Sequence, residues 1–141
     1  MLQLIRIEDD LPEGFAALRE AAASEGYRHM DRLAAEHAAG RSVFVALFGA
    51  LLGGELVGIG GLTHEPEPEA ELAMRMRRLY VRADVRRQGV ARALASALTQ
   101  EGLDQVALLT VHAGDARAAA FWEAQGFAPV DHRPWSHELR R

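Results

Sequence analysis

The chain has 141 residues, of which 49% are hydrophobic and 26% charged, and its formal net charge is −4. These values predict one globular domain over residues 1–141 and argue against a nucleic-acid-binding surface and a nucleic-acid partner. All 16 basic residues are arginine, and there is no lysine, cysteine or asparagine. The absences exclude a Schiff-base lysine, a P-loop lysine, a thiol nucleophile and a thiolate metal site. No apolar run is long enough to cross a membrane, and acidic residues stand where a signal peptide would be apolar, so we expect a cytoplasmic protein.

The first half of the chain is predicted to contain a strand, two helices and a β-hairpin. Hydrophobic spacing places them, in chain order, at a strand over 2–7, helices over 12–23 and 27–39, and strands over 43–48 and 55–62. The pair Gly53–Gly54 between the last two strands is typical of a tight hairpin turn. The acidic, proline-rich segment 65–69 that follows predicts an extended connector, because proline excludes a helix or a central strand there.

The second half alternates strands and helices. The expected elements are a strand over 72–81, a helix over 89–100, a strand over 105–111, a helix over 115–125, and short strands over 127–130 and 135–139. Asp115 is suited to cap the second of these helices, and Gly126 is suited to end it. The order of elements predicts a mixed α/β (α+β) domain.

The junction between the strand ending at Val81 and the helix beginning at Gly89 is the most informative segment. Small residues at Gly89 and Ala91 let a ligand approach backbone N–H groups that have no partner in the first helical turn. The positive end of the helix dipole adds to this, so the junction is suited to bind a pyrophosphate. Seven of the 16 arginines lie between Arg75 and Arg92; each alone is also typical of a solvated face. The segment lacks the three glycines of a dinucleotide-binding fold.

The pattern Arg86-x-x-Gly89-x-Ala91 resembles the Q/R-x-x-G-x-G/A signature of the GNAT N-acetyltransferase superfamily. Leu79-Tyr80-Val81 is similar to the strand that leads into that signature. Residues 115–127 resemble the family's later motif, in which Asn-x-x-Ala-x-x-Phe-Tyr leads to Gly-Phe. The resemblance implies a three-layer fold whose mixed central sheet is splayed between the fourth and fifth strands, with helices on both faces.

The resemblance further implies an acetyl-CoA-dependent N-acetyltransferase that binds acetyl-CoA between the strands over 72–81 and 105–111. The backbone of Leu79 and Val81 would pair with the pantetheine arm, much like an added strand. One of those two amides would also polarise the thioester carbonyl. The remaining residues expected at the acetyl-CoA site are Arg86, Arg87, Gln88, Gly89, Val90, Ala91, Arg92, Asp115 and Trp122.

Two of these residues depart from the family pattern. Asp115 replaces asparagine, which keeps the helix cap but removes an amide donor. Trp122 replaces a tyrosine that is thought to protonate the departing thiolate, and an indole cannot act as an acid. Expelling a thiolate of pKa about 8.5 near pH 7 costs only about 2 kcal/mol, whereas deprotonating an alkylamine of pKa about 10.4 costs roughly 4–5 kcal/mol. We therefore expect catalysis to depend more on a base than on an acid.

Candidate bases are few, because the glutamate that the family often carries in the strand before Leu79 is missing here. His112, at the end of the strand over 105–111, is the favoured base. Glu71 and His64 flank the connector and could act through a water molecule. Each of the three also fits a loop residue without a catalytic role. His137 could line the acceptor pocket, but its facing is undetermined.

The acceptor is predicted only in outline. Arg75 could bind an acceptor carboxylate, although a surface position or a cofactor phosphate would explain it equally, and the acidic segment 65–71 favours a cationic acceptor instead. The six histidines are scattered and indicate no metal site. We expect direct attack by a small-molecule primary amine in a ternary complex, with no membrane partner. A protein N-terminal or lysine acetyltransferase and a non-catalytic acyl-CoA-binding or regulatory module are the alternatives, and a homodimer is possible because the resembling family often forms one.

Overall fold

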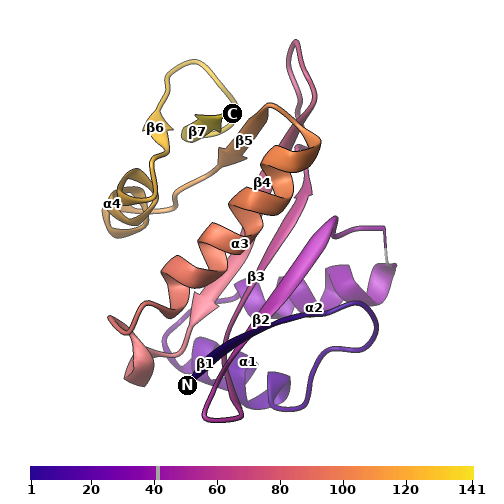
Figure 1. Cartoon of the computed structure of the whole chain (residues 1–141), viewed down its shortest axis with the longest axis vertical. Helices are drawn as coiled ribbons and strands as arrows, with labels where there is room; N and C mark the ends of the chain where they lie inside the picture. The colour runs from indigo at the N-terminus through magenta and orange to yellow at the C-terminus, as the bar shows by residue number, and fades with distance from the viewer. Residues whose placement is uncertain (41) are drawn as a thin grey trace.

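The computed structural model describes residues 1–40 and 42–141, which form a seven-stranded mixed sheet with helices on both faces (Figure 1). The strands are β1 (Leu2–Arg6), β2 (Ala46–Leu52), β3 (Glu55–His64), β4 (Ala73–Val81), β5 (Leu108–Val111), β6 (Ala128–Pro129) and β7 (His137–Arg140). The helices are α1 (Phe15–Ser24), α2 (His29–Ala39), α3 (Val90–Gln105) and α4 (Ala116–Ala124), with a short 3₁₀ turn at Ala83–Val85. The predicted mixed α/β architecture is confirmed. Within the described residues, no helix is long and apolar enough to cross a membrane.

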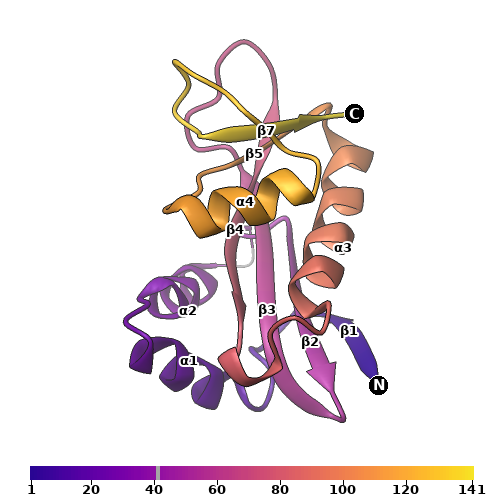
Figure 2. The same cartoon turned by 90° about the vertical axis from the view of Figure 1, so that its left-hand side faces the viewer.

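The sheet is opened between β4 and β5. The strand order is β1-β2-β3-β4-β5-β7-β6, and the β4–β5 pair is parallel. These two strands pair only from Ala73 to Arg75 on β4 and from Leu108 to Thr110 on β5. The rest of β4, from Met76 to Val81, runs on with β3 on one side and no strand on the other (Figure 2). The predicted splay between the fourth and fifth strands is therefore confirmed.

Two hydrophobic cores lie on opposite faces of the sheet. On one face, Leu94 and Leu98 of α3 are fully buried over β2, β3 and β4. On the other face, α1 and α2 pack a second core around Ile59 and Tyr80. Figure 2 shows α1 and α2 on one side of β4, α3 on the other, and α4 lying across the open edge. Helices on both faces leave β3 buried along nearly its whole length.

The helix over 89–100 is longer than the sequence predicts, because α3 continues to Gln105. Gly102 lies inside this extension, where α3 meets β5. A Cβ atom at Gly102 would lie 2.5 Å from Cδ2 of Leu109, so the glycine permits close packing. The predicted strand over 105–111 is correspondingly wrong at its start, since β5 begins at Leu108.

A β-bulge interrupts β4 at Arg78, whose φ is +58°. The pairing with β3 shifts there, between Ile59 and Gly61. Before the bulge, Arg75 and Arg77 share a face of β4, and their register opposite β3 places them on the side covered by α1 and α2. After the bulge, Tyr80 returns to that same face. The bulge therefore brings Arg77, Arg78 and Tyr80 to one end of the open edge.

Candidate active site

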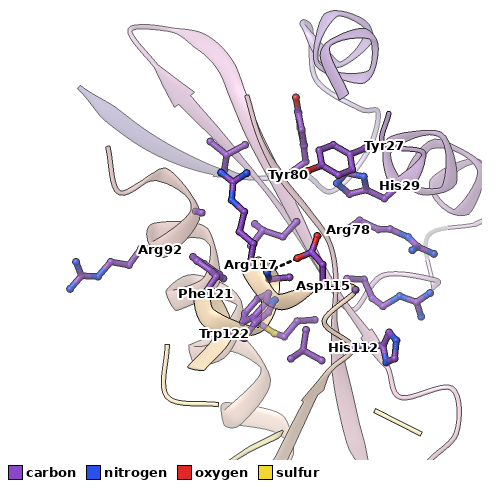
Figure 3. Close-up of a pocket in the computed structure, with 18 of the residues that line it drawn as sticks. Tyr27, His29, Arg78, Tyr80, Arg92, His112, Asp115, Arg117, Phe121 and Trp122 are labelled. Carbon is purple, nitrogen blue, oxygen red and sulfur yellow. Dashed lines mark hydrogen bonds between the residues drawn. The ribbon is translucent and has the colours of Figure 1, made fainter. Parts of the chain in front are cut away.

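The open edge of β4 borders a cavity of about 820 Å³ (Figure 3). Its walls come from the α1–α2 turn, β4, the beginning of α3, the end of β5 and α4. The cavity thus extends from the turn before α3 to the part of β4 that α2 covers.

The turn that precedes α3 presents backbone N–H groups to this cavity. Gly89 is in the left-handed region (φ +81°), and the first helical hydrogen bond runs from the N–H of Ala93 to its carbonyl. Among the described residues, the N–H groups of residues 87–92 donate to no protein acceptor. A Cβ at Gly89 would meet nothing within 4 Å, so there is open space beside this residue of the turn. Such a turn at a helix N-terminus is suited to bind an anion.

Arg86 ties this turn to α1. Its Nη1 and Nη2 donate to the two carboxylate oxygens of Glu25 at 2.8 and 2.9 Å, and its Nε donates to the Val81 carbonyl at 3.0 Å. Hydrogen bonding by Arg86 holds the pKa of Glu25 below its ordinary value. The Tyr80 hydroxyl donates to the same carboxylate, and burial together with this bond raises the pKa of Tyr80. Arg86, predicted at the acetyl-CoA site, thus engages Glu25 with both terminal nitrogens.

Three other arginines surround the turn and α4. Arg87, Arg92 and Arg117 are exposed and line the cavity, and within the part of the chain that the structure describes they form no ion pair. Arg87 and Arg92 are predicted from the sequence signature. Arg117 was not predicted at the site, because its position in the first turn of α4 corresponds to no residue of the family motif.

The two departures from the family pattern have structural roles. Asp115 caps α4, since its carboxylate accepts from the N–H of Ala118 at 2.8 Å, as predicted. Trp122 is buried and lines the cavity. Its ring makes edge-to-face contacts with Phe121 and Phe127, with centroids 5.0 and 5.2 Å apart. Trp122 therefore anchors α4 to the core beside the cavity.

Leu79 and Val81 lie on the part of β4 that continues past its pairing with β5. This is the part of the strand that the sequence predicts to bind the pantetheine arm. His29, the first residue of α2, lies beside the backbone of Leu79. The His29 ring packs edge-to-face against Tyr27 and Tyr80, at centroid distances of 5.4 and 5.5 Å (Figure 3). Burial lowers the pKa of His29, which favours the neutral imidazole. Sequence reasoning missed Tyr27 and His29, because only the packing of α2 on β4 brings them to the cavity.

The two residues predicted for catalysis, His112 and Glu71, and His137, predicted for the acceptor pocket, are dispersed. His112 is exposed and lines the cavity beyond the end of β5. Glu71 is exposed and pairs with Arg140 at 2.7 Å, away from the cavity walls. His137 is buried between Ser136 and Glu123, each at 2.8 Å from one ring nitrogen, and it does not line the cavity. The structure therefore brings His112 to the cavity, but not Glu71 or His137.

Arg75 lines the cavity but is held by a buried partner. The Glu65 side chain has no exposed surface and accepts from Arg75 Nε and from Thr110 Oγ1, both at 2.8 Å. Glu65 belongs to the segment expected to be a charged, extended connector, so its burial is a correction to that expectation. No group of three potential metal ligands occurs among the described residues.

The cavity is thus bordered by a turn of free amides and by the open edge of a splayed, parallel strand pair. The model of the acetyltransferase (GNAT) family matches residues 5–127, so the chain belongs to the GNAT acetyltransferase family. A search of curated proteins finds no match.

Solved structures show the same fold at low sequence identity. A candidate acetyltransferase from Exiguobacterium sp. 255-15 is 21% identical, with a TM-score of 0.86 over 99% of this chain and 93% of that one. A candidate GNAT acetyltransferase from Desulfovibrio desulfuricans is 19% identical, with a TM-score of 0.73 over 99% of both chains. A mutant of the toxin AtaT, solved with the C-terminus of the antitoxin AtaR and acetyl-CoA, is 15% identical, with a TM-score of 0.65 over 99% of this chain and 93% of that one.

Proposed function

We propose that this protein transfers the acetyl group of acetyl-CoA to a small-molecule primary amine, by direct attack in a ternary complex. The observation that carries the proposal is that one cavity joins the free amides before α3, the open edge of β4 and two histidines. Membership of the acetyltransferase family supports the reaction class. The structurally similar toxin AtaT, solved with acetyl-CoA, supports the choice of acyl donor.

The residues present fit acetyl-CoA. The amides of residues 87–92 would hold the pyrophosphate, and the open side of Gly89 leaves room for it. Arg87, Arg92 and Arg117 add positive charge nearby. The free edge of β4 at Leu79 and Val81 would bind the pantetheine arm. When bound, acetyl-CoA supplies a thioester carbonyl that an amine can attack.

The amine must lose a proton before it attacks, and a neutral histidine of the cavity can accept that proton. His112 is the base that the sequence predicts. We add His29 as a second candidate, because its ring packs against two tyrosines and burial lowers its pKa. Since Trp122 cannot donate a proton to the leaving thiolate, water takes that role at a cost of about 2 kcal/mol near pH 7.

Matched variants decide between the two histidines. We expect replacement of the true base by alanine to lower kcat/KM about 100-fold or more at pH 7 and to remove the acidic limb of its pH profile. The other alanine variant should keep the wild-type profile. Wild-type profiles for both His29→Ala and His112→Ala would show that neither histidine is the base.

A second candidate function is a non-catalytic acyl-CoA-binding or regulatory module. This alternative is favoured because Trp122 replaces the tyrosine that is thought to protonate the departing thiolate in the family. Acetyl-CoA binding without CoA release on any amine would support it. Among the structural neighbours, one was solved as a KacTA–DNA complex, at 18% identity and a TM-score of 0.69. For this chain, whose net charge is −4, we retain the prediction that nucleic acid does not bind.

A further inference from the structure

One end of the cavity, between α2 and β4, carries more positive than negative charge. Arg32 of α2 and Arg77 and Arg78 of β4 line it. Glu36 binds Arg78 through both carboxylate oxygens, at 2.9 and 2.8 Å. The nearest Arg77 nitrogen is 3.7 Å from Glu36, too far for a hydrogen bond, and Arg32 has no ion-pair partner among the described residues. We call these three arginines the arginine cluster; one carboxylate balances their three charges.

Arg77 is the member that is largely buried and yet makes no hydrogen bond to a carboxylate among the described residues. Its side chain is only 22% exposed, and burial followed by repulsion from Arg78 lowers its pKa. On the same strand face, Arg75 has one guanidinium nitrogen, Nη2, that is buried and without a hydrogen-bond partner within the described residues. A half-buried cation in this setting gains free energy when an anion pairs with it.

The acidic connector does not oppose this charge, although the sequence pattern alone favours a cationic acceptor. Glu65 is turned inward to Arg75 and Thr110. Glu69 pairs with Arg133 at 3.4 Å and Glu71 pairs with Arg140 at 2.7 Å, and none of the three glutamates lines the cavity. Three of the four carboxylates in the segment 65–71 are therefore matched by arginines outside the cluster, and the fourth, Glu67, does not line the cavity.

The arginine cluster adjoins the catalytic part of the cavity. Burial is the largest cause that lowers the pKa of His29, and the positive charges of Arg78 and Arg32 lower it further. Both arginines therefore lie within electrostatic range of the His29 ring. Figure 3 shows Arg78 on the same side of the cavity as His29. The His29 ring in turn packs against Tyr80 near the end of β4. A ligand that pairs with the cluster is thereby held next to the strand expected to bind the thioester.

We propose that the acceptor is a primary amine that also carries an anionic group, a carboxylate or a phosphate, and that the arginine cluster binds this group. The inference rests on the proposed acetyl transfer and specifies its substrate class. Arg77, which has no hydrogen-bond partner among the described residues, provides the main contact, while Arg32 adds charge and Arg78 is positioned by Glu36.

The test compares acceptors that differ only in the anionic group. Acetyl-CoA turnover is measured with ω-amino acids, with aminoalkyl phosphates and with alkylamines of the same chain length. Wild-type protein should show kcat/KM at least 10-fold higher for one or both anionic series, because charged hydrogen bonds of this kind commonly give roughly 10- to 100-fold preference. The series that is preferred identifies the anionic group. Equal rates for anionic and neutral amines would overturn the proposal.

Variants assign the preference to the arginine cluster. Arg77→Gln and Arg32→Gln should each lower the ratio of kcat/KM for anionic acceptors to kcat/KM for neutral acceptors. In Arg77→Gln this ratio should approach one. Arg28→Gln is the matched control, because Arg28 is exposed one helical turn earlier and does not line the cavity; it should keep the wild-type ratio. An unchanged ratio in Arg77→Gln would overturn the assignment.

Failure of the proposed function gives a different result. If no amine of any series is acetylated, binding of the same ω-amino acids and aminoalkyl phosphates to wild type and to Arg77→Gln is measured by calorimetry. Binding by the wild type that the variant loses would support the anion site without catalysis. Absent binding, or equal binding by both proteins, would overturn it.

Discussion

Replacing Gly89 by glutamate tests the anion-binding turn at its most exposed backbone position. The change places a carboxylate beside the amides of residues 87–92 without a steric clash, since a Cβ there meets nothing within 4 Å. The backbone is in the left-handed region at φ +81°, so any L side chain adds strain of about 1–2 kcal/mol. The strain alone should lower Tm by roughly 5 °C.

The effect on acetyl-CoA binding should be larger than the effect on stability. Two like charges about 5 Å apart at an effective dielectric constant of about 20 repel by about 3 kcal/mol. That repulsion alone raises Kd more than about 100-fold. The side chain also competes with the pyrophosphate for the same N–H groups.

Gly54→Glu is the matched control. Gly54 has φ +84°, its Cβ position is equally open, and it lies in the β2–β3 hairpin outside the cavity. Calorimetry should show wild-type affinity for acetyl-CoA in Gly54→Glu and a loss of about 100-fold or more in Gly89→Glu, at similar Tm. Wild-type affinity in Gly89→Glu would refute the placement of the pyrophosphate.

Two further predictions concern stability. Glu65→Ala leaves a buried arginine without its counter-charge and should cost about 3–5 kcal/mol in urea unfolding, whereas Glu69→Ala, in an exposed pair, should cost under about 1 kcal/mol; equal losses would contradict the buried pairing. Hydrogen bonding by Arg86 lowers the pKa of Glu25 in the folded state, so its stabilising contribution is present above pH 4.5 and is lost as the pH falls through the folded-state pKa. The Tm advantage of wild type over Glu25→Gln should shrink accordingly between pH 7 and acid, and a pH-independent difference would show that the carboxylate charge is not involved.

Local sequence patterns predicted the sequence of elements, because each pattern reports on its own segment. Gly53 and Gly54 form the expected hairpin, with φ values of +59° and +84°. Asp115 caps α4 as expected. The extension of α3 to Gln105 was not predicted, and Gly102 in that extension packs against Leu109 of β5.

The parts of the site that sequence reasoning missed depend on contacts between distant segments. His29 reaches the cavity only because α2 packs on the same face of the sheet as Tyr80. Glu65 lies in a segment whose composition predicts exposure, and its burial requires both Arg75 and Thr110 as partners. The bulge at Arg78 is likewise absent from any local pattern, since arginine does not favour a positive φ.

The most direct test of acetyl transfer is amine-dependent release of CoA from acetyl-CoA, measured side by side for wild type and Gly89→Glu. We expect the wild type to release CoA at a rate that rises and saturates with amine concentration. Gly89→Glu should be inactive at the same acetyl-CoA concentration. Tight binding of acetyl-CoA by the wild type with no CoA release on any amine would contradict the account and identify a binding module.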